Sequence, residues 1–209
     1  MNGYPINVSG IRMNEVAKIA VDENTINDNA IIKLILGGKK KSYKTIVDRY
    51  QRSAFFFARG MIGNSDDAYD LSQEAFVRAY NNLNKFDPIY PFKVWFYKIL
   101  SNLCKNYLRQ RKSRESVVTS TEMTDIASAP KSARPDVVYE KSETQQIVWE
   151  AIGELPEKFK EIIILNHFQD MSYEQIASIL DMPRGSVMSR LYYARQNLRG
   201  ILEGKGVRI

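Results

Sequence analysis

A polar segment at residues 113–142 divides the sequence in two and constrains its fold more than any other feature. Ser, Thr, Asp, Glu and Ala dominate this segment, which also contains Pro130 and Pro135. Such a segment buries too little apolar surface to offset the entropy lost on ordering its chain. The sequence on either side has helical periodicity, and no stretch shows the period-two alternation of a strand. We therefore expect an all-α protein of two small helical domains joined by a flexible linker.

Apolar spacing predicts the limits of these parts. Residues 1–26 are weakly periodic and are expected to form an N-terminal extension. The first helical domain should span residues 27–112 and the second residues 143–209, with residues 113–142 as the linker. The helices of the first domain are expected at about residues 27–36, 42–61, 66–86 and 92–112.

The segment from Met171 to Leu202 is typical of a helix-turn-helix. Ser172 and Gln175 have the spacing of a capping box, and Pro183 suits the first position of the following helix. The apolar spacing then defines one buried face for each of the two helices. The positions expected to be buried are Ile176, Ala177, Leu180, Val187, Leu191, Ala194 and Leu198.

The opposite face of the second of these helices has the composition of a DNA-reading surface. No acidic residue occurs between Met182 and Leu202. Small polar and aromatic side chains with arginines at the rim suit a helix that enters the major groove, where serines and tyrosines read bases and arginines anchor phosphates. The alternative is an ordinary helical hairpin with a solvated basic face. The residues assigned to this surface are Ser172, Arg184, Ser186, Met188, Ser189, Arg190, Tyr192, Tyr193 and Arg195.

The helix expected at residues 92–112 carries a second basic face, which we call the basic stripe: Lys98, Lys105, Arg109 and Lys112. These cations lie within about 60° of one another on a helical wheel. Trp95 and Asn102 lie beside them, and no acidic residue occurs between Pro88 and Arg114. Cations that pair with phosphates, next to a ring that stacks on bases, are typical of single-stranded nucleic-acid sites. The alternative is a solvated lysine face with Trp95 in the core.

Composition agrees with a nucleic-acid partner and argues against an enzyme or a metalloprotein. The net charge is +6, and 44% of the residues are hydrophobic, which is enough for packed cores. Cys104 and His167 are the single cysteine and histidine, so no metal or cofactor is expected. We expect Cys104 to be a half-buried structural residue and His167 to pack or lie at the surface. The glycines at 37–38 lack the spacing of a phosphate-binding loop.

No segment has the length of a membrane span or the pattern of an export signal. The longest apolar runs, such as residues 30–36, are far shorter than the roughly 20 residues that cross a bilayer. The N-terminus lacks a charged region followed by an apolar core. The chain is therefore expected to be cytoplasmic, without membrane insertion.

Four stretches of the sequence, at residues 70–80, 92–109, 155–165 and 172–195, follow the order of a known family. They resemble the extracytoplasmic-function (ECF) sigma factors of bacterial RNA polymerase. In order, the stretches are similar to the helix that docks on core polymerase, the promoter-melting helix, the start of region four and its helix-turn-helix. Asn106 stands where many relatives have aspartate, and Met188 and Tyr193 stand where many have basic residues. The extension before residue 27 has no counterpart.

The resemblance implies a sigma factor that binds the RNA polymerase core and directs promoter recognition, DNA melting and transcription initiation. It implies contact with the polymerase through Asp70, Gln73, Glu74 and Arg78. The second domain would read the upstream promoter element, and an anti-sigma factor would be a further partner. The alternative is a stand-alone helix-turn-helix transcriptional regulator, for which the docking and melting helices would have no purpose. The residues implied in melting the downstream element are Phe86, Trp95, Lys98, Asn102, Lys105, Asn106, Arg109 and Lys112.

Overall fold

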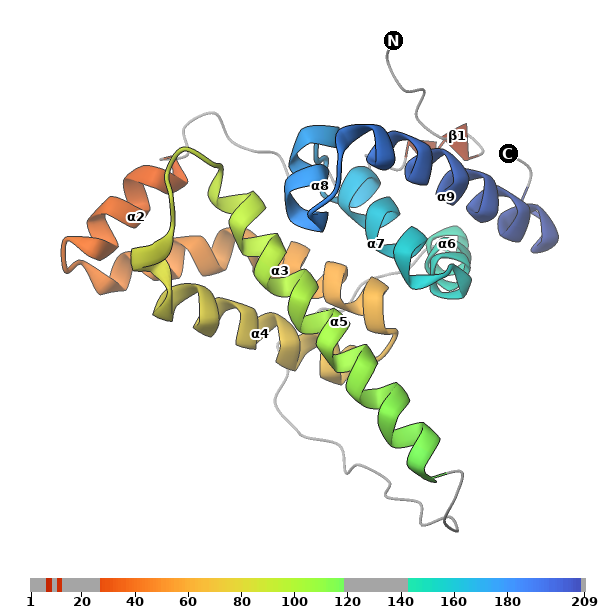
Figure 1. Cartoon of the computed structure of the whole chain (residues 1–209), viewed down its shortest axis with the longest axis horizontal. Helices are drawn as coiled ribbons and strands as arrows, with labels where there is room; N and C mark the ends of the chain where they lie inside the picture. The colour runs from red at the N-terminus through yellow and green to blue at the C-terminus, as the bar shows by residue number, and fades with distance from the viewer. Residues whose placement is uncertain (1–6, 9–10, 13–26, 119–142, 208–209) are drawn as a thin grey trace.

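The described part of the chain, in a computed structural model, comprises residues 7–8, 11–12, 27–118 and 143–207, and it is almost entirely helical (Figure 1). The prediction of an all-α fold is confirmed. The first group of helices contains α2 (Asp28–Leu36), the 3-10 turn η1 (Lys40–Ser42), α3 (Tyr43–Ile62), α4 (Ser65–Asn81), the 3-10 turn η2 (Leu83–Lys85) and α5 (Phe92–Val118). The second contains α6 (Glu143–Glu154), α7 (Glu157–Ile163), the π-helical turn η3 (Ile164–Phe168), α8 (Tyr173–Leu180) and α9 (Arg184–Gly204).

A short β-hairpin pairing lies within the predicted N-terminal extension, where no strand was expected. Strands β1 (Asn7–Val8) and β2 (Ile11–Arg12) pair antiparallel, with Val8 opposite Ile11. Two residues are too few for period-two alternation to be visible, although valine and isoleucine favour extended backbone. The rest of the predicted extension lies outside the described residues.

The helices begin at the capping residues that local chemistry favours. Asn27 accepts a hydrogen bond from the amide of Asn29 at the start of α2, and Asn64 accepts from two amides at the start of α4. Ser172 and Gln175 form the predicted capping box of α8. These side chains satisfy amides that the helix itself leaves without partners.

Two helix ends differ from the sequence expectation. The helix expected to reach residue 86 ends at Asn81, and the 3-10 turn η2 follows it. Helix α5 continues to Val118, into the segment expected to be linker. No proline or glycine interrupts this stretch, and Arg111 pairs with Glu115 one turn later, which supports the added turns. The remainder of the predicted linker, residues 119–142, lies outside the described residues.

The second domain is built on the apolar face predicted for α9. Val187, Leu191, Ala194 and Leu198 are all fully buried there. In α8 the buried pair is Ile176 and Ile179, whereas Ala177 and Leu180 are half-buried, contrary to the expected assignment. Helix α8 packs on both α5 and α9. Its buried positions are therefore set by two neighbours rather than by α9 alone.

The two groups of helices are in direct contact, an arrangement that the residue pattern does not predict. Helices α6 and α7 and the turn η3 pack on α3, while α8 packs on α5 (Figure 1). At Gly60 of α3 an added Cβ would lie 2.6 Å from Ile164 Cδ1 and 2.7 Å from Trp149 Cζ3. Only a residue without a side chain lets the second group approach α3 so closely.

A buried polar contact also joins the two groups. The hydroxyl of Tyr97, in α5, donates a hydrogen bond to Gln169 Oε1 at 2.5 Å, and the Gln169 amide donates to the Ser53 carbonyl at 3.3 Å. Both Tyr97 and Gln169 are buried. Separating the groups would require water to replace these hydrogen bonds.

Candidate nucleic-acid interface

The outward face of α9 has the exposure expected of a surface that contacts DNA. Tyr192 and Tyr193 are each 58% exposed and Met188 is 51% exposed, although large apolar or aromatic side chains usually avoid water. Ser186 and Ser189 are exposed beside them. The Ser189 hydroxyl donates to helix carbonyls, at 3.2 Å from Gly185 O, and its oxygen remains able to accept a hydrogen bond.

The basic side chains at the rim of α9 are placed differently from one another. Arg184 is exposed and forms an ion pair with Glu174 at 2.7 Å. Arg190 is half-buried. Arg195, also assigned to the DNA surface, donates from Nε to His167 Nε2 at 3.2 Å and from a terminal nitrogen to Asn166 Oδ1 at 3.0 Å. Its guanidinium therefore joins α9 to η3 as well as lying near the predicted surface.

The other member of the predicted DNA surface, Ser172, lies at the start of α8. Its hydroxyl oxygen accepts a hydrogen bond from the backbone amide of Gln175 at 3.2 Å, which makes Ser172 the N-cap of that helix. The side chain is exposed. Cap formation uses one acceptor position of the hydroxyl, and a hydrogen bond with the Glu174 carboxylate, whose pKa it helps to lower, involves the same group.

His167 is a buried member of the second domain, which agrees with the packing role expected for it. Burial, together with the nearby positive charge of the Arg195 guanidinium, lowers its pKa to about 4. The imidazole is therefore neutral at pH 7 and can accept the Arg195 hydrogen bond. Because the pKa is lower in the folded chain than in the unfolded chain, the unfolded state binds more protons between those two values.

Acidification is therefore expected to destabilise the second domain. Stability should be complete above about pH 6.5 and should fall as the pH drops toward 4, by about 2 kcal/mol at pH 5. Urea unfolding at pH 7 and pH 5 measures this loss. His167→Gln, which keeps a hydrogen-bond acceptor, should lose less stability over the same interval. An equal loss in the variant would assign the effect to other groups.

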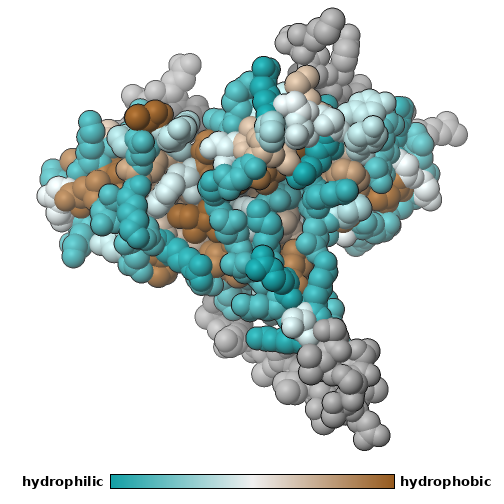
Figure 2. All heavy atoms as spheres, viewed as in Figure 1, coloured by the Kyte–Doolittle hydropathy of each residue, from teal (hydrophilic) through white to brown (hydrophobic). Residues whose placement is uncertain are grey.

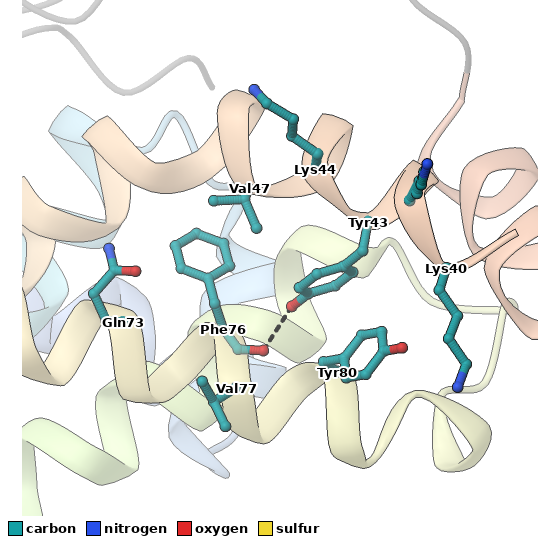
Figure 3. A pocket seen from close by; sticks show the side chains of 9 residues that line it. Lys40, Tyr43, Lys44, Val47, Gln73, Phe76, Val77 and Tyr80 are labelled. Carbon is teal, nitrogen blue, oxygen red and sulfur yellow. Dashed lines mark hydrogen bonds between the residues drawn. The ribbon is translucent and has the colours of Figure 1, made fainter.

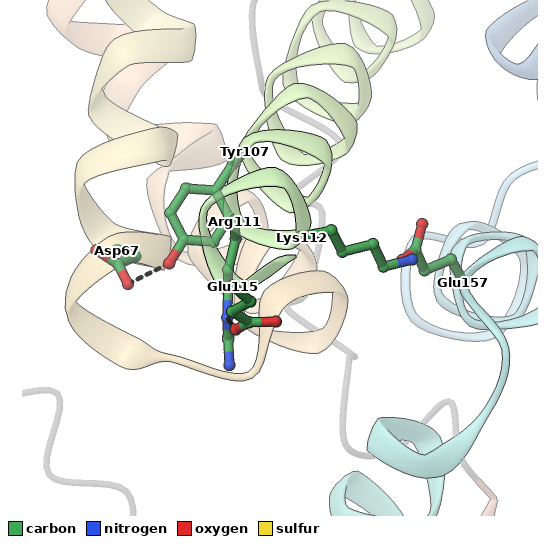
Figure 4. A network of polar contacts seen from close by, with 6 residues as sticks. All are labelled: Asp67, Tyr107, Arg111, Lys112, Glu115 and Glu157. Atoms are coloured by element: carbon green, nitrogen blue, oxygen red, sulfur yellow. Dashed lines mark hydrogen bonds and ion pairs between the residues drawn. The ribbon is translucent and has the colours of Figure 1, made fainter. Parts of the chain in front are cut away.

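The three lysines of the basic stripe on α5 pair with carboxylates of the second domain and stay partly exposed to solvent. Lys98 Nζ lies 2.5 Å from Asp181 Oδ1, and Lys105 Nζ lies 3.3 Å from Glu161 Oε1. Lys112 extends from α5 to Glu157 of α7 at 2.5 Å (Figure 4). Arg109 is exposed.

The acidic partners of the stripe were not identified from the sequence. Each lies more than forty residues away along the chain. No periodicity within a helix can indicate such a pairing. Lys93 was likewise missed: it is largely buried, its Nζ donates to the Gln169 carbonyl, and burial lowers its pKa.

An aromatic cluster lies at the N-terminal end of the stripe. Trp95 is half-buried. The centroid of its ring lies 5.5 Å from the ring centroid of Phe86 and 5.7 Å from that of Phe92. It is therefore partly a core residue and partly accessible. Phe86 is buried, whereas Asn102 and Asn106 are exposed further along α5.

A side-chain hydrogen bond joins α5 to α4, and the cysteine of α5 lies in the core. The Tyr107 hydroxyl donates to Asp67 Oδ2 at 2.6 Å, near the start of α4 (Figure 4). Cys104 is fully buried, more deeply than expected, and burial raises the pKa of its thiol to about 12. A neutral, inaccessible thiol is a poor nucleophile, which agrees with a structural role.

The acidic face of α4 lies on the outside of the first domain. Asp70, Glu74 and Arg78 are exposed, and Gln73 is half-buried. Arg78 pairs with Glu74 one turn earlier at 2.6 Å. The predicted polymerase-docking residues are therefore accessible.

A groove next to this face was not anticipated from the sequence. It lies between α4 and the start of α3, has a volume of about 500 Å³, and is mostly apolar (Figure 3). The Tyr43 hydroxyl donates to the Phe76 carbonyl at 2.7 Å across it, and Val77 is 59% exposed at its edge. We call this the α4 groove; its lining residues are Lys40, Lys41, Tyr43, Lys44, Val47, Gln73, Phe76, Val77 and Tyr80.

Neither a metal site nor a membrane span is found among the described residues. No group of three or more potential ligands is close enough to hold a metal ion there. None of the described helices is both long and apolar enough to cross a bilayer. Hydrophilic side chains cover most of the face drawn in Figure 2, with hydrophobic residues in separate patches.

Comparison with known proteins identifies the family to which this chain belongs. Residues 46–114 match the sigma-70 region 2 family, and residues 145–198 match sigma-70 region 4. The ECF RNA polymerase sigma-E factor of Haemophilus influenzae is 30% identical over 183 residues, covering 85% of this chain and 96% of that protein. The chain belongs to the ECF sigma factors. It is a promoter-directing subunit of RNA polymerase, in a family of transcription initiation factors that are not enzymes.

Other relatives agree with this assignment. The ECF RNA polymerase sigma factor SigW of Bacillus subtilis is 31% identical, covering 80% of this chain and 92% of that sigma factor. The fold is similar to that of the sigma factor RpoE of Bartonella quintana, solved in complex with the anti-sigma factor NepR. The TM-score is 0.64 at 24% identity, covering 78% of this chain and 98% of RpoE.

Proposed function

We propose that α9 of this sigma factor reads the upstream promoter element and that α5 melts the downstream element, while α4 holds core polymerase. The observation that supports this most directly is the presence of two basic surfaces, on α5 and α9, each on a stretch without acidic residues. One suits the duplex groove and the other suits single-stranded DNA. The chain itself catalyses no reaction in this proposal and acts in the cytoplasm, where the polymerase is.

The roles on α9 follow from exposure. Ser186, Ser189, Tyr192 and Tyr193 are exposed on the outward face and are proposed to contact base edges, with Met188 between them. Arg184 and Arg190 flank this face and are proposed to bind phosphates. Arg195 is proposed to act mainly by holding α9 on η3, because its guanidinium already donates to His167 and Asn166. Ser172 is proposed to contact a phosphate through its exposed hydroxyl.

The roles on α5 follow from the aromatic cluster and the stripe. Trp95, supported from below by Phe86, is proposed to stack on a base freed from the duplex. Asn102 and Asn106 would hydrogen-bond that strand, and Lys98, Lys105, Arg109 and Lys112 would pair with its phosphates. Unstacking a base costs a few kcal/mol, which stacking on a protein ring partly offsets.

Core polymerase is proposed to bind the exposed face of α4 together with the α4 groove. Asp70, Gln73, Glu74 and Arg78 supply polar contacts there. The groove beside them supplies apolar area, which a polar face alone lacks. Interfaces commonly gain most of their affinity from a few well-packed, desolvated positions, and a groove can supply such a position.

Val77→Asp is expected to weaken the binding of core polymerase about tenfold or more, because it places a charge at the edge of the apolar groove. Fluorescence anisotropy with labelled chain and purified core measures this affinity. Leu36→Asp, which changes an exposed leucine at the end of α2, is the matched control and should bind normally. Equal affinities for the two variants would remove the groove from the polymerase interface.

An anti-sigma factor is proposed as a further partner. The support is the similar fold of the Bartonella quintana protein, whose structure was solved with one. When tagged chain is purified from its native host under conditions that keep its promoters silent, the anti-sigma factor should be recovered with it. The anti-sigma factor should release the chain when those promoters are induced. Failure to recover such a protein under any growth condition would contradict this part of the proposal.

The alternative function is that of a stand-alone regulator, and DNA binding with and without core separates the two. The chain alone should bind promoter duplex weakly, and adding core should produce a stable complex. Electrophoretic mobility shift with a matching promoter fragment measures both. Tight, sequence-specific duplex binding by the chain alone would favour the regulator.

A further inference from the structure

The second domain presents a row of carboxylates to the basic stripe of α5. We call Glu157, Glu161 and Asp181 the acidic row. Each pairs with a different lysine of the stripe, at distances of 2.5 to 3.3 Å between nitrogen and oxygen. The pairs are Lys98 with Asp181, Lys105 with Glu161, and Lys112 with Glu157.

The acidic row follows the stripe along the length of α5. From Lys98 to Lys112 the helix rises by about 21 Å. Glu157 and Glu161 are one turn apart on α7 and share a face, while Asp181 follows the end of α8. The acidic row therefore places negative groups at intervals along one face of α5. This spacing resembles the charge pattern of a nucleic-acid backbone, which the same lysines are proposed to bind.

Glu161 distinguishes this arrangement from an incidental set of surface ion pairs. It is only 6% exposed, and its carboxylate accepts a hydrogen bond from the Ser101 hydroxyl of α5 in addition to its pair with Lys105. A buried carboxylate is tolerated only where partners of this kind compensate for lost hydration. The tight approach at Gly60 and the Tyr97–Gln169 hydrogen bond hold the same two domains together.

We propose that the acidic row acts as an internal competitor of nucleic acid: in the free chain it pairs with the lysines of the basic stripe, and single-stranded DNA binds to these lysines only when the two domains separate. The proposal rests on the proposed role of α5 as a single-strand site. Two of the three ion pairs are substantially exposed, and such pairs contribute little stability individually. A partner that holds the domains apart can therefore open the arrangement.

The electrostatic test is the double variant Glu157→Gln with Asp181→Asn, made in the full chain. Both residues are accessible, so the fold should survive, as circular dichroism can verify. Binding of a fluorescein-labelled oligothymidylate at low salt should become about three- to tenfold tighter, because two competing ion pairs are lost. The matched control is Asp48→Asn with Glu203→Gln, which removes the same charge from ion pairs that lie within single helices. Its affinity should change much less.

A second test opens the interface without changing any charge. Gly60→Ala places a methyl group against Ile164 Cδ1 and Trp149 Cζ3, at distances too short to keep, so these side chains or the second domain must shift. By loosening the packing of the second domain on α3, it should also tighten oligothymidylate binding. Gly200→Ala, on the open side of α9 with no atom near its added Cβ, is the matched control and should not.

Each outcome bears on the proposal. We call the Glu157→Gln/Asp181→Asn double variant and Gly60→Ala the opening variants. Tighter oligothymidylate binding by both, with unchanged binding by both controls, supports the proposal. An equal gain in the charge control assigns the effect to net charge alone and overturns it. Unchanged affinity in both opening variants, or no binding in any chain, also overturns it. Chain-dependent transcription with core polymerase tests the proposed function separately: if wild-type chain directs transcription while the opening variants bind oligothymidylate no better, only the internal competitor is wrong.

Discussion

Replacing Trp95 with alanine is expected to lower promoter-dependent run-off transcription about 10- to 100-fold. Loss of one base-stacking platform corresponds to roughly 1–3 kcal/mol, and the same change removes ring contacts that position Phe86 and Phe92. The defect should lie in strand opening, so permanganate reactivity of promoter thymines should fall while affinity for core polymerase stays normal.

Trp95→Phe is the matched control for that experiment. It retains an aromatic ring at the end of the stripe and should keep a substantial part of the activity. A Trp95→Ala chain with normal strand opening would assign Trp95 to the core alone. Equal defects in both variants would point to packing against Phe86 and Phe92, not to base stacking.

The second large effect concerns the core of the helix-turn-helix. Leu191 is fully buried in α9, and Leu191→Ala is expected to reduce the unfolding free energy by about 2–5 kcal/mol. A loss of this size is a large fraction of the stability of a small domain. Transcription from promoters that need the upstream element should fall with it. Urea unfolding monitored by circular dichroism measures the stability change.

Tyr192→Ala is the matched control, because Tyr192 is the neighbouring residue but is mostly exposed. It should leave the unfolding free energy nearly unchanged while weakening recognition of the upstream element. The two variants together separate the buried and DNA-facing sides of one helix. Equal destabilisation by both would contradict the assignment of the faces.

The sequence was sufficient to predict the faces of α9, because one helix period relates all of its positions. Val187 and Leu191 are buried where the spacing placed them, and Tyr192 and Tyr193 are exposed. The capping box of α8 also follows from residues three positions apart. Such features depend on neighbours along the chain, for which the physical rules are strong.

The docking of the two domains could not be predicted in the same way. It depends on pairings such as Ser101 with Glu161, between residues far apart in the chain. A glycine at position 60 gives no sign in the sequence that Trp149 packs against it. The α4 groove is likewise formed by two helices together, so its lysines and apolar residues look ordinary when each helix is considered alone.

The most direct test of the central claim is run-off transcription from a promoter library with purified core polymerase, with and without this chain. As a sigma factor, the chain should yield transcripts from a restricted set of promoters that share an upstream and a downstream element at fixed spacing. Deleting either element should abolish them. Transcripts that do not depend on the chain, or none from any promoter with active core, would contradict the account.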